Sequence, residues 1–125
     1  MLRLLLVTTR QAKIGSFVEG LSSDGDVRLD WVASKDAALD SVRGNPPHLV
    51  IVDSELSALE PLKLVAELLT VNAMVNTALM SSLSDQDFHE TTEGFGILDR
   101  LPIVPDEGDA RNLLHKLRRV LGIAA

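Results

Sequence analysis

Short runs of apolar, β-prone residues alternate with amphipathic segments of helical period along the whole chain. The predicted strands cover residues 2–7, 27–33, 48–53, 76–81 and 97–101. Between and after them, apolar residues recur at the i, i+3, i+4 and i+7 spacing of one helix face. Strands that alternate strictly with helices predict a parallel sheet covered on both faces. At 125 residues the chain is long enough for one core, so the sequence predicts a single α/β domain over residues 1–125.

The predicted helices carry recognisable start and stop signals. Ser34 and Ser84 are expected N-caps, because a hydroxyl there accepts a bond from a free backbone N–H of the first turn. Pro61 must lie in the first turn of the third helix, because proline cannot donate to the helix ladder. The last helix is expected to begin near Asp106. Trp31 is predicted to pack, partly buried, in the core beneath a helix, since it alternates with Leu29 and Ala33 on one face of its strand.

Two of these helices have apolar faces that the sequence defines residue by residue. The third helix is expected to bury Leu59, Leu62, Val65, Ala66 and Leu69. The last is expected to bury Ala110, Leu113, Leu114, Leu117 and Leu121.

Composition excludes several classes of function. There is no cysteine, which removes disulfides, thiolate zinc sites and cysteine nucleophiles. A net charge of −6 disfavours binding to nucleic acid, whose affinity comes largely from clustered Lys and Arg. The basic cluster of Lys116, Arg118 and Arg119 falls in the last turns of a helix, where cations complement the helix dipole. No apolar stretch approaches the roughly 20 residues of a membrane span, so a cytoplasmic protein without membrane contact is expected.

Asp53 is the candidate functional residue, because a carboxylate follows directly on the buried strand 48–52. In an open α/β sheet, ligands and chemistry collect outside the carboxyl ends of the strands. The simpler alternative is that Asp53 opens a turn by bonding its own backbone two residues on.

Five strand–helix units with Asp53 after the third strand, Ser81 at the end of the fourth and Pro102 just after the fifth resemble the receiver domain of bacterial two-component response regulators. The resemblance covers essentially the whole chain. It implies a doubly wound, flavodoxin-like parallel sheet in the order 2-1-3-4-5 with five helices. It also implies that Asp53 is the phosphoacceptor for a histidine kinase and that the Ser81 hydroxyl bonds the new phosphoryl group as a switch.

The chain departs from the family at the residues that bind metal and phosphoryl groups. Thr8 and Thr9 stand where the family has an acidic pair, and Leu101 stands where it has a lysine. Threonine hydroxyls are weak ligands for Mg²⁺, which leaves only Asp53 and the backbone carbonyl of Glu55 as ligands implied by the resemblance. No cofactor beyond a weakly held Mg²⁺ is therefore expected. These losses favour a degenerate receiver, which is not an enzyme and acts through protein partners.

The partners that the resemblance implies are a histidine kinase, a phosphotransfer protein or an output protein. The usual receiver contact face is formed by the predicted fourth helix, the strand 97–101 and the last helix. Phe95 and the apolar segment 103–105 lie in that neighbourhood. A contiguous apolar patch in such a place is typical of a partner-binding surface. The same face is the candidate interface of a homodimer.

Two other functions remain open. The first is a working receiver that is phosphorylated on Asp53 with Mg²⁺. The second is a flavin or nucleotide site, because residues 8–11 lie between the first strand and the first helix, where helix N-terminal amides bind phosphate. Against the second, this loop has no glycine before Gly15, and the whole chain has only four Phe and Trp residues and no Tyr.

Overall fold

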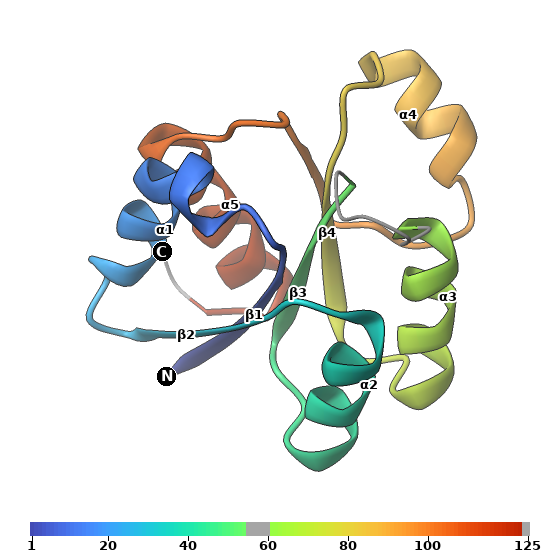
Figure 1. The fold of residues 1–125 in the computed structure, drawn as a ribbon, viewed down its shortest axis with the longest axis horizontal. Helices are drawn as coiled ribbons and strands as arrows, with labels where there is room; N and C mark the ends of the chain where they lie inside the picture. Colours follow the sequence, from blue (N-terminus) through green and yellow to red (C-terminus); the bar gives the residue numbers. More distant parts are fainter. Residues whose placement is uncertain (55–60, 124–125) are drawn as a thin grey trace.

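Five parallel strands form one open sheet in the order β2-β1-β3-β4-β5 (Figure 1). The computed structural model describes residues 1–54 and 61–123. The strands are β1 (Leu2–Val7), β2 (Val27–Val32), β3 (Leu49–Asp53), β4 (Asn76–Met80) and β5 (Asp99–Leu101). This order confirms the prediction from the receiver resemblance, and it makes β2 and β5 the two edge strands.

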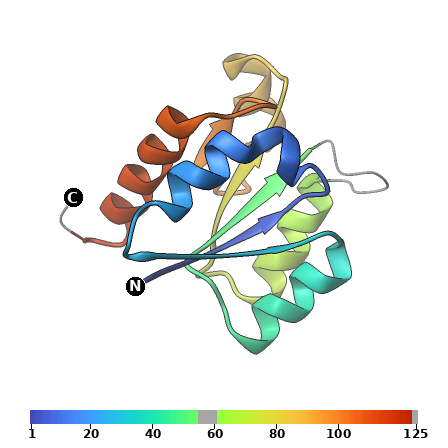
Figure 2. The same ribbon diagram turned by 60° about the vertical axis from the view of Figure 1, so that its left-hand side comes forward.

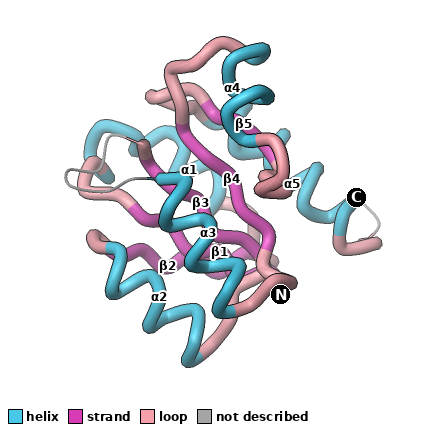
Figure 3. Tube along the Cα trace, turned by 90° about the vertical axis from the view of Figure 1, so that its right-hand side faces the viewer, coloured by secondary structure: helices cyan, strands magenta, loops and turns pink. Residues whose placement is uncertain are grey.

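Helices cover both faces of the sheet. They are α1 (Gly15–Ser22), α2 (Lys35–Gly44), α3 (Pro61–Val71), α4 (Asp85–Thr92) and α5 (Glu107–Val120), and a short 3₁₀ helix, η1 (Gln11–Ile14), precedes α1. Figure 2 shows α1 and α5 together on one face, with α2 and α3 on the other. Figure 3 shows α4 beside β5, at the end of the sheet away from β2. The predicted alternation of strands and helices is confirmed.

The central strands are largely apolar because each of their faces meets a helix layer. In β1, Leu4 and Leu6 pack into the core beneath α1 and α5, whereas Leu5 and Val7 pack into the core on the α2 and α3 side. Residues of β3 divide between the two cores in the same way. Side chains alternate across a strand, so a strand between two helix layers needs apolar residues at consecutive positions. This arrangement positions Asp53, the last residue of β3, at the carboxyl edge of the sheet.

Most predicted helix boundaries are confirmed. The hydroxyls of Ser34 and Ser84 accept bonds from the backbone N–H groups of Ala37 and Asp87, at 3.2 Å each. Pro61 is the first residue of α3. Asp106 caps α5 and forms a reciprocal pair of bonds with Asp109. In α5 the predicted face is also right, with Ala110, Leu113, Leu114 and Leu117 buried and Leu121 packed against them.

The predicted face of α3 is partly wrong. The helix buries Leu64, Val65 and Leu68, whereas Ala66 is exposed. Leu62 and Leu69 are only half-buried, and Leu59 lies outside the described residues. Apolar residues surround most of this helix, so their spacing leaves its rotation open, and packing against the sheet decides it.

The predicted core packing of Trp31 is also wrong, since 53% of its surface is exposed. Val27 and Leu29, on the same face of β2, do pack against the core beneath α1 and α5. Trp31 does not belong to that core. The reason is the edge position of β2, which has β1 on one side only, so the helix layer covers the start of the strand and leaves its end exposed.

At the amino-terminal edge of the sheet, His48 connects β3 to β1. Its Nδ1 accepts a hydrogen bond from the backbone N–H of Arg3 at 2.9 Å, which requires an unprotonated Nδ1. Burial lowers the pKa of His48 from its ordinary value of 6.5, and the charges of Arg3 and of the N-terminus lower it further. The folded protein therefore favours the neutral imidazole.

This lowered pKa predicts a loss of stability in mild acid. Above about pH 6.5 His48 is neutral in both states, and below it the unfolded chain binds a proton before the folded protein does. The free energy of unfolding should therefore fall as the pH drops below about 6.5 toward the lower folded pKa. Urea unfolding at about pH 7.5 and about pH 5.5 measures this loss. His48→Asn keeps an acceptor that does not titrate and should lose less, whereas exposed His115→Asn should behave as the wild type. Equal losses in the wild type and His48→Asn would contradict the assignment.

Candidate functional site

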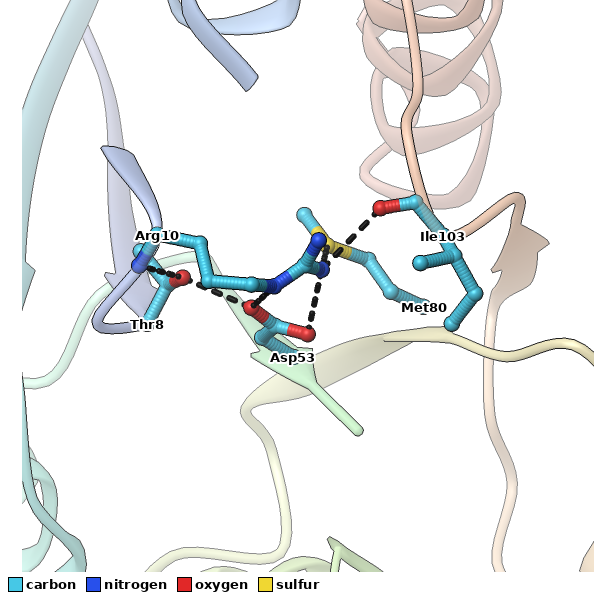
Figure 4. Close-up of polar contacts among 5 residues, drawn as sticks. All are labelled: Thr8, Arg10, Asp53, Met80 and Ile103. Carbon is cyan, nitrogen blue, oxygen red and sulfur yellow. Dashed lines mark hydrogen bonds and ion pairs between the residues drawn. The ribbon is translucent and has the colours of Figure 1, made fainter. Parts of the chain in front are cut away.

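Asp53 lies in a buried polar cluster at the carboxyl edge of the sheet (Figure 4). Its side chain is fully buried. The cluster also contains Thr8, directly after β1, and Arg10, in the loop between β1 and η1. Met80 at the end of β4 and the backbone of Ile103, beyond β5, complete it. The structure thus places the predicted site residue Asp53 where residues from four parts of the chain meet.

The guanidinium of Arg10 holds both oxygens of the Asp53 carboxylate. Nε donates to Oδ2 at 2.7 Å and Nη2 donates to Oδ1 at 2.7 Å. Only 14% of the Arg10 side chain is exposed. Two parallel, charge-assisted bonds to one carboxylate are the strongest pairing that an arginine forms with a side chain. Arg10 therefore places a fixed positive charge directly on the candidate phosphoacceptor.

Thr8 ties this ion pair to the backbone of its own loop. Its hydroxyl donates to Asp53 Oδ2 at 2.7 Å and accepts a bond from the backbone N–H of Arg10 at 2.9 Å. The backbone N–H of Thr8 in turn donates to the carbonyl of Val32 at 3.0 Å. A side chain that both donates and accepts here fixes the turn that directs Arg10 toward Asp53.

Arg10 also reaches the far side of the site. Its Nη2 donates to the backbone carbonyl of Ile103 at 3.0 Å and lies 4.0 Å from the sulfur of Met80. One side chain thus links the loop after β1, the end of β3 and the segment that leads from β5 into α5. Figure 4 shows the guanidinium between Asp53 and Ile103.

Ser81 reaches the same edge but directs its hydroxyl into its own loop. Met80 is the registered neighbour of Asp53 in the sheet, so Ser81 is one residue beyond it. Ser81 is buried, and its Oγ accepts a bond from the backbone N–H of Leu83 at 3.1 Å. Its own N–H donates to the carbonyl of Leu101 at 2.9 Å. The hydroxyl oxygen therefore serves a local turn.

The two threonines predicted to replace the acidic pair have different environments. Thr8 is fully buried and bonds Asp53, whereas Thr9 is exposed. Leu101, which the resemblance places at the position of the family lysine, is 2% exposed and packs in the core beneath α1 and α5. Glu55, the other expected metal ligand, lies outside the described residues. The positive charge at this site thus comes from the loop after β1 and not from β5.

The described residues around Asp53 do not fit Mg²⁺. This ion requires several hard oxygen ligands in octahedral geometry, and here a guanidinium lies against both oxygens of the carboxylate. Among the described residues, no group of three or more His, Cys, Asp or Glu side chains could hold a metal ion. No chemical step through a metal follows from this arrangement.

Arg10 is not among the site residues predicted from the sequence, where Thr8 and Thr9 are compared with the acidic pair of the family and residues 8–11 with a phosphate-binding loop. A signal was present in the sequence. The resemblance left Asp53 without acidic neighbours and without the family lysine, and a buried carboxylate needs a compensating charge. Arg10 is the basic residue closest to the end of β1, at the same sheet edge as Asp53.

No family model and no curated protein matches this sequence. No helix in the described part of the chain has the length and apolar character needed to cross a membrane.

Solved structures do match, and those with high scores include response regulators. A two-component response regulator from Legionella pneumophila has a TM-score of 0.78 and 16% identity, over 95% of this chain and 99% of that one. A CheY-like receiver domain protein from Methanospirillum hungatei JF-1 has a TM-score of 0.76 and 16% identity, over 98% and 94%. The response regulator domain of Thermotoga maritima CheB has a TM-score of 0.75 and 17% identity, over 100% and 99%. The chain therefore has the fold of the receiver domains of response regulators.

Proposed function

We propose that this domain is a degenerate receiver in a two-component signalling pathway, which binds a protein partner without being phosphorylated and is not an enzyme. The observation that carries the proposal is the buried, bidentate ion pair between Arg10 and Asp53. The partner belongs to the class that contains histidine kinases, phosphotransfer proteins and output proteins. The receiver fold supports this class of function.

The ion pair opposes phosphorylation of Asp53 because it occupies the carboxylate that would attack the phosphoryl group. A carboxylate that attacks a phosphoryl group must present a free oxygen to the phosphorus, and a cation must neutralise the charge that develops on the phosphoryl oxygens. Arg10 engages both oxygens of Asp53, so attack requires that this buried pair first separate. Arg10 also supplies a positive charge at Asp53 without a metal or a lysine on β5.

The same contacts fix the segment after β5. Arg10 binds the carbonyl of Ile103, and the N–H of Ser81 binds the carbonyl of Leu101. A switch needs an element with two arrangements whose balance a modification can shift. Here the site is already closed by its own side chains, which supports a domain that presents one surface to its partner at all times.

A surface between α4, β5 and α5 is the proposed contact region for the partner. A shallow depression of about 670 Å³ lies there. Its lining combines apolar and charged side chains, among them Phe88, Ile97, Leu98, Arg100 and Lys116. Phe95 is half-buried, and Val104 is 62% exposed. This mixture of apolar and charged groups suits a protein interface, which combines an apolar centre with a polar rim.

The second candidate is a phosphoacceptor receiver, and the position of Asp53 favours it. The carboxylate ends β3 at the carboxyl edge, and a serine hydroxyl follows the neighbouring strand. In this alternative, Arg10 leaves Asp53 when a phosphoryl donor and Mg²⁺ bind.

Intact-mass measurement after incubation with acetyl phosphate, with and without Mg²⁺, distinguishes the two functions. We expect no phosphoryl adduct on the wild type under either condition. An Mg²⁺-dependent adduct that disappears in Asp53→Asn would refute the proposal and establish a working receiver. The variant Thr9→Asp with Arg10→Ala restores one acidic side chain and removes the guanidinium. An adduct on this variant alone would show that the reactive carboxylate survives behind Arg10.

A further inference from the structure

The outer edge of β2 has a sequence that is complementary to itself. This edge strand reads Val27-Arg28-Leu29-Asp30-Trp31-Val32 and pairs with β1 on one side only. In Figure 2 it lies at the near edge of the sheet, with α1 above it and α2 below. We propose that this edge pairs antiparallel with β2 of a second copy of the chain. The twofold axis passes between the two Leu29 residues. The proposal concerns a surface separate from the Asp53 site.

The backbone of β2 has hydrogen-bonding groups available for this pairing. The N–H groups of Leu2 and Thr8 donate to the carbonyls of Asp26 and Val32, at 2.7 and 3.0 Å. The backbone N–H and C=O groups of the even-numbered residues of β2 therefore point toward β1. Those of Leu29 and Trp31 point outward, because these directions alternate along a strand. The outward N–H of Val27 already donates to Asp24 at 3.0 Å, which leaves its carbonyl as an acceptor.

These outward groups match in an antiparallel pair centred on Leu29. Each Leu29 then lies opposite Leu29 of the second copy, and the two exchange both backbone bonds. Each Trp31 lies opposite Val27 of the second copy and donates its N–H to the carbonyl there. A twofold axis repeats every contact, as in other isologous interfaces. The pairing extends the five-stranded sheet into a continuous sheet across two molecules, the β-augmentation mode of recognition.

The charges on β2 match in the same register. Arg28 lies opposite Asp30 of the second copy, and Asp30 lies opposite Arg28. These are the non-hydrogen-bonded positions of the pair, where facing side chains are closest. Both side chains are exposed, and within the chain they form a long ion pair at 3.7 Å. Edge strands usually carry charges that discourage pairing, but here opposite signs at i and i+2 form attractive pairs across the twofold axis. This charge pattern identifies a second copy as the occupant.

The same pairing buries part of the exposed Trp31 side chain. It is 53% exposed, on the face of β2 where Val27 and Leu29 are partly buried. An aromatic residue beside a β-branched residue of a neighbouring strand is a stabilising cross-strand pair. Trp31 would lie beside Val27 of the second copy. Because Trp31 is the only tryptophan in the chain, its fluorescence reports directly on this contact.

Sedimentation velocity and tryptophan emission over a wide range of protein concentration test the proposal. The wild type should shift from monomer to dimer with rising concentration, and its emission should move to shorter wavelength in parallel. Arg28→Asp and Asp30→Arg each turn two attractive pairs into two repulsive ones, so each should raise the dissociation constant about tenfold or more. The double variant Arg28→Asp with Asp30→Arg exchanges the two charges and should restore dimerisation.

A control on another face separates this interface from the surface of α4, β5 and α5. Val120→Asp introduces a charge on α5, at a residue that is 56% exposed, and should leave dimerisation unchanged. Circular dichroism confirms that every variant is folded. A wild type that stays monomeric at all concentrations would overturn the proposal. So would a double variant as weak as the single ones, or a dimer that Val120→Asp abolishes and the β2 variants leave intact.

Discussion

Replacing Arg10 with alanine is expected to lower the free energy of unfolding by about 3–5 kcal/mol. The substitution removes both bonds to Asp53 and leaves a fully buried carboxylate without its guanidinium. It also removes the bond from Arg10 to the carbonyl of Ile103. Because the free energy of unfolding of a domain is about 5–15 kcal/mol in total, this one substitution removes a large fraction of it. Urea unfolding followed by circular dichroism measures it.

Two variants show whether the cost comes from the buried pair. Arg43→Ala removes an arginine from an exposed pair with Asp40, in which the side chains are 59% and 79% exposed, and should cost less than about 1 kcal/mol. Arg10→Met with Asp53→Leu replaces the buried pair with apolar groups and should recover much of the lost stability, because no uncompensated charge remains. If Arg10→Ala costs no more than Arg43→Ala, the ion pair does not stabilise the fold.

Placing the family lysine at residue 101 is expected to have opposite effects in two backgrounds. In the wild type, Leu101→Lys puts a second cation into the core beside a carboxylate that Arg10 already neutralises, and should destabilise the protein by about 3–5 kcal/mol. In Arg10→Ala the same lysine should restore stability, because it supplies the missing charge. The reason is geometric, since Asp53, Met80 and Leu101 form one row across β3, β4 and β5.

The spacing of that row makes the rescue feasible. Neighbouring strands lie about 4.8 Å apart, so the Cα atoms of Asp53 and Leu101 are separated by roughly 10 Å, within reach of an extended lysine and an aspartate. The coupling energy from the four proteins, measured by urea unfolding, is the readout. Leu101→Met is the matched control, because it keeps the length without the charge and should not rescue Arg10→Ala. Additive effects of Arg10→Ala and Leu101→Lys would show that the two cations do not serve the same carboxylate.

Sequence periodicity predicted most of the fold for a definite physical reason. Strands such as β1 and β3 are buried on both faces, so nearly every residue in them must be apolar, and that pattern is visible without neighbours. Caps such as Ser34 and Ser84 act within four residues of chain, so local sequence suffices for them as well. The wrong predictions for the buried face of α3 and for Trp31 concern features that local sequence does not determine. Both depend on how much of an element a neighbouring layer covers, which no local pattern records.

For the candidate site, too, the sequence determined one part and the tertiary structure another. The sequence by itself determined that Asp53 ends a buried strand, and the resemblance predicted that Thr8, Thr9 and Leu101 stand where receivers have charged residues. Only the tertiary structure decided that Arg10 compensates Asp53, because their pairing joins residues 43 positions apart through a loop whose course depends on Thr8. Buried charge is balanced in space rather than along the chain. The sequence therefore shows the buried carboxylate, and the fold shows which residue compensates its charge.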